Sequence, residues 1–324
     1  MKIVNTAPLP ADFLKSLIET RVSSVDLTIV DAHKFSQDKL AAEFSDADIV
    51  LGDYTASTPI TLAVVSNAKK LKLIQQPSVG YNHIDIAACK KSGIPVANTP
   101  GANDIGVAEH TIMLALSALK NLPYYNAKTH AGEWLFSEAQ STGVFELNEK
   151  IYGLLGMGRT ARAVAERLAP FGVKLLYYDI VKLSAAEEKK YGASYALMEE
   201  ILRTADVVSI HLPLLPETTK IIDAVKLALM KSSAVLINVG RGALVDEKAL
   251  AHALREKKIA FAAVDVFAEE PPPPDHPFFG LPNMILTCHL AGSTRESGGR
   301  IINMALDNLA RVLKGENPLW LINN

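Results

Sequence analysis

The sequence has few cysteines, little net charge and no long apolar runs, and each of these absences argues against a class of protein. Its 324 residues include only two cysteines, Cys89 and Cys288, whose separation fits neither a disulfide framework nor a thiolate metal site. We interpret both as small buried residues in a reducing compartment, and we expect no metal. Lys and Arg, 33 together, nearly balance 35 Asp and Glu, so charge offers no reason to expect nucleic acid as a partner.

Long apolar runs are also missing. No stretch approaches the roughly 20 apolar residues of a membrane-spanning helix. The N-terminus lacks the long apolar region of a secretory signal, and its first residues are typical of a strand. We therefore expect a cytoplasmic protein with no membrane partner. Apolar residues make up 49% of the chain and charged residues 21%, which is the balance of a globular protein with an ample core.

What the sequence does contain is a repeated alternation of short apolar runs with helical patterns. In residues 1–100 we expect strands at 3–4, 25–30, 48–51, 71–74 and 95–97, separated by helices at 11–20, 36–44, 61–68 and 84–92. A second series begins at residue 150, with later strands at 173–178, 206–210, 233–237, 260–264 and 284–286, and helices at 246–257 and 295–314. Such alternation predicts parallel sheets covered by helices on both faces. The length of the chain suggests two domains.

The segment between the two series is harder to interpret. A strongly apolar helix is expected over 105–119, ended by Pro123, and its role could be in the core, between domains or at a subunit contact. Residues 124–148 show no clean period, so we expect an irregular arm there.

The second series opens with a glycine-rich turn. The apolar run 151–155 ends in Gly156-Met157-Gly158, and a helical pattern begins at once. Gly156 permits a tight turn, Gly158 lets the backbone approach phosphates, and the small Ala161 allows close packing of helix on strand. The first helical turn offers N–H groups and the positive end of the helix dipole to an anion. The pattern predicts a dinucleotide site.

Asp179 strengthens that prediction. It follows the apolar run 173–178, about 20 residues beyond the glycines, where an acid binds the adenosine ribose 2′-hydroxyl. Because a carboxylate repels a 2′-phosphate, we predict NAD rather than NADP as cofactor. The alternative is that Asp179 is only a solvated residue at a strand end.

Three charged positions follow later strands of the same series. Arg241 lies between two glycines after 233–237, Glu269 and Glu270 follow 260–264, and His289 follows 284–286. Each alone has an ordinary explanation as a surface or structural residue. Together they could perform one reaction at the strand ends of a single sheet. A histidine exchanges a proton with a hydroxyl or carbonyl oxygen, a carboxylate stabilises its protonated form, and an arginine binds a substrate carboxylate. A nicotinamide beside them would exchange a hydride.

With these motifs in place, the chain resembles the D-isomer-specific 2-hydroxyacid dehydrogenases over nearly its whole length. The resemblance rests on residues 79–85, 98–101, 107–109, 156–159, 238–242, 265–267 with 270–271, and 289–294, in that order and spacing.

The resemblance implies that Arg241, Glu270 and His289 form the catalytic set. His289 would be the acid/base, Glu270 its partner, and Arg241 the group that binds the substrate carboxylate and polarises the reacting oxygen. Glu270 is preferred to Glu269 because the family's glutamate stands directly before a proline.

The resemblance also implies the binding residues. The N–H groups of Val79 and Gly80 would receive the substrate carboxylate, and Asp265 would hold the nicotinamide carboxamide. The other cofactor residues would be Thr111, Gly156, Gly158, Arg159, Thr160, Asp179, Leu212, Pro213, Thr218, Val239 and Gly292.

Some positions depart from the family's pattern. Ser78 stands where many members have Gly, which alters the expected shape of the substrate loop. Cys288 replaces the proline that usually precedes the catalytic histidine, and Ala161 replaces the third glycine. None of these changes removes a catalytic group. The other histidines match no catalytic slot and are interpreted as structural or surface residues: His33, His83, His110, His130, His211, His252 and His276.

The family's layout implies two doubly wound parallel-sheet domains with a cleft between them. The substrate domain would be flavodoxin-like and discontinuous, residues 1–100 and 291–324, and the Rossmann NAD-binding domain would be residues 101–290. We expect a homodimer built on the helix from Ile105 and the arm around Trp134. Because the chain ends soon after its last helix, we expect no appended regulatory domain.

The resemblance implies an NAD-dependent enzyme that interconverts a small 2-oxo acid and its D-2-hydroxy acid. Two alternatives stay open at this point. One is a relative that oxidises formate or phosphite, and the other is an NAD(H)-sensing protein on the same fold that acts as a corepressor.

Overall fold

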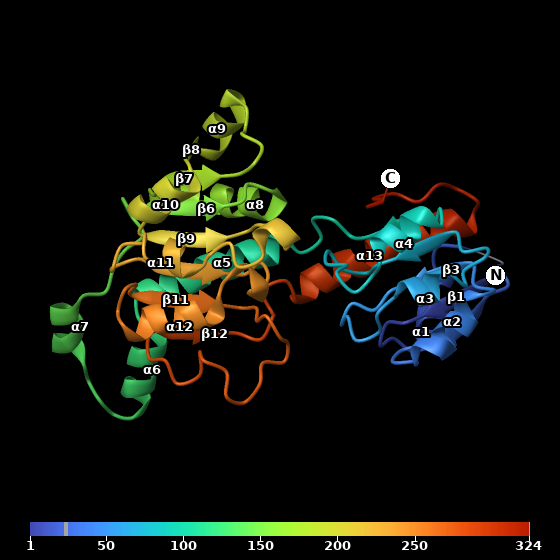
Figure 1. Ribbon diagram of the computed structural model, residues 1–324, viewed down its shortest axis with the longest axis horizontal. Coiled ribbons are helices and arrows are strands. Elements are labelled where there is room, and N and C mark those ends of the chain that lie inside the picture. Colours follow the sequence, from blue (N-terminus) through green and yellow to red (C-terminus); the bar gives the residue numbers. More distant parts are fainter. Residues whose placement is uncertain (23–24, 324) are drawn as a thin grey trace. The chain divides into compact units, whose positions relative to one another are not determined.

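The structure is a computed structural model that describes residues 1–22 and 25–323. The chain forms two compact units, Met1–Asn103 with Arg295–Asn324 and Asp104–Thr294. Figure 1 shows the elements of both units. Residues 23, 24 and 324 belong to the range expected for the first domain and lie outside the described residues. The expected α/β class with two parallel sheets is confirmed.

The first unit is built on a five-stranded sheet. Its order is β2-β1-β3-β4-β5, and all pairs are parallel. The strands are β1 Lys2–Asn5, β2 Thr28–Asp31, β3 Ile49–Leu51, β4 Leu73–Gln75 and β5 Val96–Ala97. The helices are α1 Ala11–Glu19, α2 Gln37–Phe44, α3 Leu62–Val65, α4 Ile86–Lys91 and α13 Arg295–Leu313.

Both faces of this sheet are buried, and the side chains of successive strand residues point to opposite faces. Ile3 and Ile49 pack with apolar residues of α1 and α13, whereas Val4 and Val50 pack with those of α2, α3 and α4. Side chains alternate across a strand with period two, so each short strand must be apolar at consecutive positions to fill both layers. This is why the strands read as continuous apolar runs.

The second unit contains a seven-stranded parallel sheet, in the order β12-β11-β10-β9-β6-β7-β8. Its strands are β6 Ile151–Leu155, β7 Lys174–Tyr178, β8 Ala193–Tyr195, β9 Val207–Ile210, β10 Val235–Asn238, β11 Phe261–Val264 and β12 Met284–Leu286. The strand order reverses between β6 and β9. Loops on either side of such a reversal diverge, and ligands of open α/β sheets bind at that switch point.

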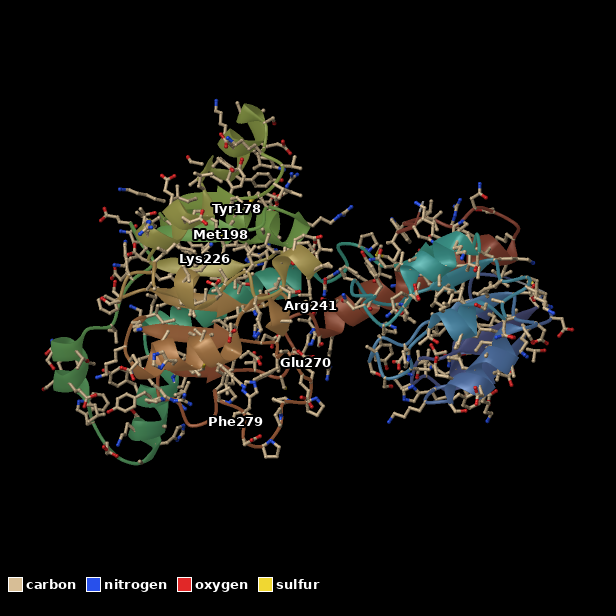
Figure 2. All side chains as sticks on the ribbon, in the orientation of Figure 1. Tyr178, Met198, Lys226, Arg241, Glu270 and Phe279 are labelled. Atoms are coloured by element: carbon tan, nitrogen blue, oxygen red, sulfur yellow. The ribbon has the colours of Figure 1, made fainter. Side chains whose placement is uncertain are left out.

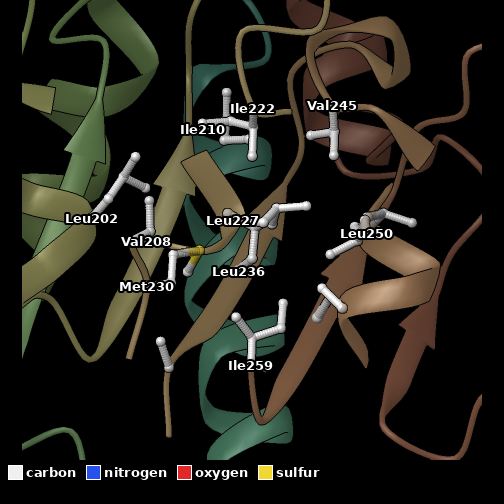
Figure 3. Packing of buried hydrophobic residues seen from close by; sticks show 14 of the residues in the cluster. Leu202, Val208, Ile210, Ile222, Leu227, Met230, Leu236, Val245, Leu250 and Ile259 are labelled. Carbon is white, nitrogen blue, oxygen red and sulfur yellow. The ribbon is translucent and has the colours of Figure 1, made fainter. Parts of the chain in front are cut away.

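Helices cover both faces of the second sheet. On one face lie α5 Asp104–Leu119 and α8 Arg159–Leu168. On the other lie α10 Met198–Thr204, α11 Ala224–Leu227 and α12 Glu247–Arg255, and Figure 3 shows the apolar cluster they share with β9 and β10. The helix α9 Ala185–Tyr191 leads into β8, and a capping box between Ser184 and Glu187 begins it. Short 3₁₀ turns occupy Ala169–Phe171, Pro216–Thr218 and Gly242–Leu244.

The expectation of an irregular arm over 124–148 is wrong. The structure forms α6 Leu122–His130 and α7 Phe136–Thr142 there. Asn121 takes a left-handed φ of 45°, which separates α5 from α6, and Pro123 lies in the first turn of α6, where its missing N–H is no loss. Neither helix buries a residue within the unit, so the sequence shows no apolar stripe to reveal them.

Within residues 1–22 and 25–323, no helix combines the length and apolar character needed to cross a bilayer.

Candidate active site

The glycine turn between β6 and α8 has little room for side chains. Gly156 has a φ of +97°, and a Cβ there would lie 2.8 Å from the carbonyl oxygen of His211. Its N–H donates to the carbonyl oxygen of Tyr178 at 2.8 Å. Only glycine satisfies both the backbone angle and the close approach, so the turn keeps its backbone open at the switch point of the sheet.

The N-terminus of α8 follows at once. Gly158 is its N-cap, and no atom lies within 4 Å of a Cβ added there. The N–H groups of the first helical turn have no partner within the helix, so they can receive an anion from this open side. The Thr160 hydroxyl donates to Oδ1 of Asp104 at 2.9 Å, while Arg159 is exposed.

Asp179 is hydrogen-bonded to this turn. Its Oδ2 accepts from the Met157 N–H at 2.7 Å, and its Oδ1 accepts from the Val181 N–H at 3.1 Å. The carboxylate therefore lies beside the glycines, and each oxygen keeps a lone pair for a further donor. An anion site at a helix N-terminus and a fixed acceptor for a ribose hydroxyl fit the two halves of an adenosine diphosphate.

A histidine–carboxylate pair lies beyond β11 and β12. Nδ1 of His289 is 2.6 Å from Oε2 of Glu270, whose Oε1 accepts from the Phe267 N–H at 3.0 Å. Because the carboxylate accepts, Nδ1 carries the proton and exchange with a ligand falls to Nε2. Burial acts to raise the pKa of Glu270, but the hydrogen bonds from His289 and Phe267 hold that pKa below its ordinary value. The side chains are 49% and 36% exposed, so both can be reached from outside.

The loop that carries His289 is attached to Asp265. This side chain, 1% exposed at the end of β11, accepts from the N–H groups of Leu290 and Ala291 at 2.9 Å each. The Asp265 carbonyl accepts from the His289 N–H at 2.7 Å, and His289 has a left-handed φ of 55°. These hydrogen bonds hold the backbone angle that a histidine rarely adopts.

Two further residues complete this attachment. The Thr287 hydroxyl donates to Oδ1 of Asp265 at 2.6 Å, and Nε2 of His110 lies 3.1 Å from the same hydroxyl oxygen. The one hydroxyl proton of Thr287 lies in the hydrogen bond to Asp265, so in the contact with His110 the donor is Nε2 of His110. Burial lowers the pKa of His110, although the Asp265 charge acts to raise it.

The sequence indicates only a structural or surface role for His110 and gives no signal at Thr287. The partners His110 and Thr287 stand 177 positions apart, so no local pattern indicated them.

Arg241 follows β10 in a loop shaped by its neighbours. The Asn238 side chain donates to the Arg241 carbonyl at 2.9 Å, and the Arg241 guanidinium donates to the Gly240 carbonyl at 2.8 Å. A Cβ at Gly242 would lie 1.9 Å from the carbonyl carbon of Phe267, so glycine lets this loop lie against the one that carries Glu270. Burial lowers the pKa of Arg241, and the nearby Glu270 charge acts to raise it. Figure 2 labels both residues.

The other residues expected to line the cofactor also lie in the second unit. Thr111 is buried in α5, and its hydroxyl donates to the Val107 carbonyl at 2.7 Å. Leu212, Pro213 and Thr218 lie in the loop after β9, where the Thr218 hydroxyl donates to the Pro213 carbonyl at 2.7 Å. Two more follow β10 and β12, namely Val239 and Gly292. Val79 and Gly80 belong to the first unit.

The two cysteines differ from each other. Cys89 is buried as expected, and burial raises the pKa of its thiol to about 11. Cys288 is exposed, so its expected burial is wrong. It lies beyond the end of β12, in the turn that presents His289, where the sheet no longer covers it. Over the described ranges, no three His, Cys, Asp or Glu side chains are grouped so that they could hold a metal.

The chain is similar to known proteins over most of its length. A family model described as "D-isomer specific 2-hydroxyacid dehydrogenase, NAD binding domain" matches residues 112–291. The glyoxylate reductase of Thermofilum pendens is 40% identical over 290 residues, which are 89% of this chain and 85% of the relative. The D-3-phosphoglycerate dehydrogenase of Methanocaldococcus jannaschii is 37% identical over 316 residues, 98% of this chain but 58% of that relative.

A solved structure extends the similarity to three dimensions. The NAD-dependent formate dehydrogenase of Staphylococcus aureus, solved in complex with NAD, has a TM-score of 0.83 and 30% identity, with 99% of each chain covered.

The doubly wound sheet, the glycine turn with Asp179 and these similarities define an NAD-dependent oxidoreductase, and its cofactor is NAD. Within this class, the chain belongs to the D-isomer specific 2-hydroxyacid dehydrogenase family. The expectations of family and cofactor are confirmed.

Proposed function

We propose that this protein interconverts a small 2-oxo acid and its D-2-hydroxy acid, with His289 as acid/base, Glu270 as its partner and Arg241 as the carboxylate-binding group. The observation that carries the proposal is the 2.6 Å contact between His289 Nδ1 and Glu270 Oε2. This contact orients the ring and leaves Nε2 for the reacting oxygen. A carboxylate at that distance stabilises the imidazolium that forms when the proton arrives.

Each group has one task in the proposed reaction. Bound NADH supplies the hydride for the 2-carbon of the oxo acid. His289 donates its proton to the oxygen as that oxygen becomes a hydroxyl, and recovers one when the reaction runs toward oxidation. Arg241 binds the substrate carboxylate through two N–H groups and polarises the carbonyl.

We also propose roles for the binding residues expected from the family. The N–H groups of Val79 and Gly80 receive the substrate carboxylate, and Asp265 accepts from the nicotinamide carboxamide. The first turn of α8, with Arg159 and Thr160, binds the diphosphate. Its open N-terminus and the glycine at its cap support this assignment. The remaining cofactor contacts are Thr111, Gly156, Gly158, Asp179, Leu212, Pro213, Thr218, Val239 and Gly292.

The acid/base pair favours a hydroxy acid over formate, although a formate dehydrogenase is among the similar structures. Formate becomes carbon dioxide by losing a hydride alone after ionisation, so no oxygen needs a proton. A histidine held 2.6 Å from a carboxylate is useful where a hydroxyl is made or consumed. The identity to a glyoxylate reductase points to the same class of substrate.

The test is turnover on a panel of substrates. We expect NADH absorbance to fall with glyoxylate, hydroxypyruvate or pyruvate, and no formation of NADH from NAD and formate. Activity with formate alone would favour the formate-oxidising alternative. Tight NADH binding without turnover on any substrate would favour the NAD-sensing alternative.

The same assay tests the residues. We expect His289→Gln and Arg241→Ala to lower kcat/KM by about 10³-fold or more, because each removes a group that acts in the transition state. NADH fluorescence titration checks that cofactor binding is intact. A variant that binds NADH and turns over near the wild-type rate would remove that residue from the proposal.

We further propose a homodimer through α5, α6 and α7. These helices expose Met113, Leu122 and Phe136, and the segment between α6 and α7 exposes Trp134, which is 82% exposed. A groove of about 670 Å³ between α5 and α8 adds Ile112 and the residues around it. Exposed apolar side chains gathered on neighbouring elements are typical of a surface that a second copy covers. Sedimentation should give twice the 35.0 kDa of the chain, and Trp134→Glu should shift the mass toward the monomer.

A further inference from the structure

The loop after β4 in the first unit, residues 78–81, is held by its carbonyl groups. The Ser78 carbonyl accepts from the Thr99 N–H at 3.2 Å, and the Val79 carbonyl accepts from Nδ2 of Asn98 at 2.9 Å. The Gly80 carbonyl accepts from the Ser78 hydroxyl at 2.7 Å. Three successive peptide groups are therefore each hydrogen-bonded through their oxygen atoms.

These contacts also set the directions of the N–H groups. In a trans peptide the C=O and the following N–H lie in one plane and point in opposite directions. Binding of the Ser78, Val79 and Gly80 carbonyls therefore orients the N–H groups of Val79, Gly80 and Tyr81. In the described part of the chain, none of these three N–H groups donates a hydrogen bond. They stay available to an acceptor from outside.

The Ser78 hydroxyl is itself oriented by Gln76. Nε2 of Gln76 donates to the Ser78 oxygen at 2.8 Å and to the Asp53 carbonyl at 3.2 Å. The Asp53 carbonyl can only accept, so the Gln76 amide must direct its nitrogen toward Asp53 and Ser78. The Ser78 oxygen accepts from that nitrogen, so the Ser78 hydroxyl proton is donated to the Gly80 carbonyl. Gln76 is fully buried, and a Cβ at Gly52 would lie 2.1 Å from its Oε1. The side chain that orients Ser78 is therefore closely confined.

A buried amide layer anchors the loop to the rest of the unit. Nδ2 of Asn308, in α13, donates to Oε1 of Gln75 at 2.7 Å, and Nε2 of Gln75 donates to the Gln76 carbonyl at 3.0 Å. Gln75 and Asn308 are fully buried, and Asn98 is 6% exposed. Both amide atoms of Gln75 and of Asn308 have partners, so a slip would leave these buried groups unpaired. Oε1 of Gln76 has no partner among the described residues.

We propose that Ser78 is a positioning residue for substrate binding. Its hydroxyl holds the Gly80 peptide so that the loop presents its N–H groups to the substrate carboxylate. This inference rests on the proposed function of Val79 and Gly80 and adds a role for the residue that differs from the glycine of many family members. Ser78 does not touch the substrate; it acts through the backbone that does. Pre-organised N–H donors bind an anion without the cost of ordering them first.

The test compares Ser78→Ala with Ser78→Thr, which keeps a hydroxyl. Ser66→Ala is the matched control, because Ser66 is exposed in the same unit and also donates to a carbonyl, that of Leu62 at 2.8 Å. Two quantities are measured: KM for the preferred 2-oxo acid, and the Kd of oxamate for the enzyme–NADH complex by calorimetry. Oxamate carries the carboxylate of a 2-oxo acid but is not reduced, so its Kd reports binding alone.

For Ser78→Ala we expect both constants to rise by about two- to tenfold, the range for loss of one neutral hydrogen bond. The kcat and the KM for NADH should stay unchanged, and Ser78→Thr and Ser66→Ala should resemble wild type. Unchanged oxamate affinity in Ser78→Ala would overturn the role of Ser78 while leaving the proposed function standing. A wild-type enzyme that neither reduces a 2-oxo acid nor binds oxamate would overturn both.

Discussion

Nδ1 of His289 lies 2.6 Å from Oε2 of Glu270, and the second oxygen of the same carboxylate accepts from the Phe267 N–H. The carboxylate is thereby fixed by backbone on one side and by the imidazole on the other. A ring held in this way has one tautomer and one orientation, which leaves Nε2 free to exchange a proton with a ligand. The pair joins segments 19 residues apart that follow different strands of one sheet.

We expect Glu270→Gln to lower kcat/KM by about 10²-fold, because the amide cannot stabilise the imidazolium as a carboxylate does. Glu269→Gln is the matched control: the neighbouring carboxylate is exposed and should leave the rate unchanged. Equal losses in the two variants would show that charge in this loop matters, and not the contact with His289.

The pH dependence of the same pair follows from the pKa of Glu270. His289 and the Phe267 N–H hold that pKa below its ordinary 4.5 although burial opposes them. The carboxylate is therefore ionised at every pH above about 4.5. The infrared carboxylate band of Glu270, identified by its loss in Glu270→Gln, should show no protonation in the wild-type enzyme between pH 9 and 5. Protonation of Glu270 between pH 7 and 6 would contradict this expectation.

Cofactor choice should depend on Asp179. We expect Asp179→Ser to raise the KM for NADH by about tenfold or more, because the acceptor for the ribose hydroxyl is lost. The preference for NADH over NADPH should also decrease, because the carboxylate that repels a 2′-phosphate is gone. Asp179→Asn keeps an acceptor for the Met157 N–H and removes only the charge. Its preference should fall between wild type and Asp179→Ser, as measured by kcat/KM with each cofactor. An unchanged preference in both variants would contradict the assignment.

Thr287 should matter although we propose no contact between it and the substrate or the cofactor. Thr287→Val removes the 2.6 Å hydrogen bond to Asp265 and the acceptor of His110 while keeping the shape of the side chain. We expect kcat to fall by roughly tenfold and the free energy of unfolding by about 1–2 kcal/mol, since a buried carboxylate loses a donor. Thr287→Ser should restore both. Loss of stability without loss of kcat would make the contact structural only.

The stability of the first unit should show a pH dependence from Asp53. This fully buried carboxylate accepts from the Thr55 N–H at 2.8 Å and from the hydroxyls of Thr55 and Ser57 at 2.7 and 2.8 Å. Burial acts to raise its pKa, but these donors hold the pKa below the ordinary 3.8. A depressed pKa contributes stability above the unfolded value, and the contribution is lost as pH falls through the folded value.

The matching variant is Asp53→Asn. We expect it to be less stable than wild type by about 2 kcal/mol at pH 7, with a constant difference down to pH 5 that shrinks below about 4. Denaturant unfolding at pH 8, 5 and 3.5 measures this. A difference that is as large at pH 3.5 as at pH 5 would show that Asp53 is not the group responsible.

Local patterns predicted much of the fold and of the candidate site. The strands of both sheets are apolar on consecutive residues because both faces are buried, and this pattern is visible without any tertiary information. The glycine turn, with Asp179 about 20 residues later, could be predicted because the constraint comes from backbone angles and chain length within one βαβ unit. Arg241, Glu270 and His289 stand directly after strands, so their common location at the ends of one sheet followed from the parallel topology.

Tertiary structure decided two kinds of feature: helices that bury no residue within their unit, and contacts between residues that are distant in the sequence. Helices α6 and α7 bury nothing within the unit, so no periodicity revealed them. The exposure of Cys288 depended on where β12 ends. The contact of His110 with Thr287 joins positions 177 residues apart, and the Ser78 loop depends on Asn98, which directly follows β5. A helix or strand that packs along its length against one core needs apolar residues at regular intervals, and this periodicity can be recognised in the sequence. A single hydrogen bond between distant side chains requires no repeated residues, so no sequence pattern indicates it.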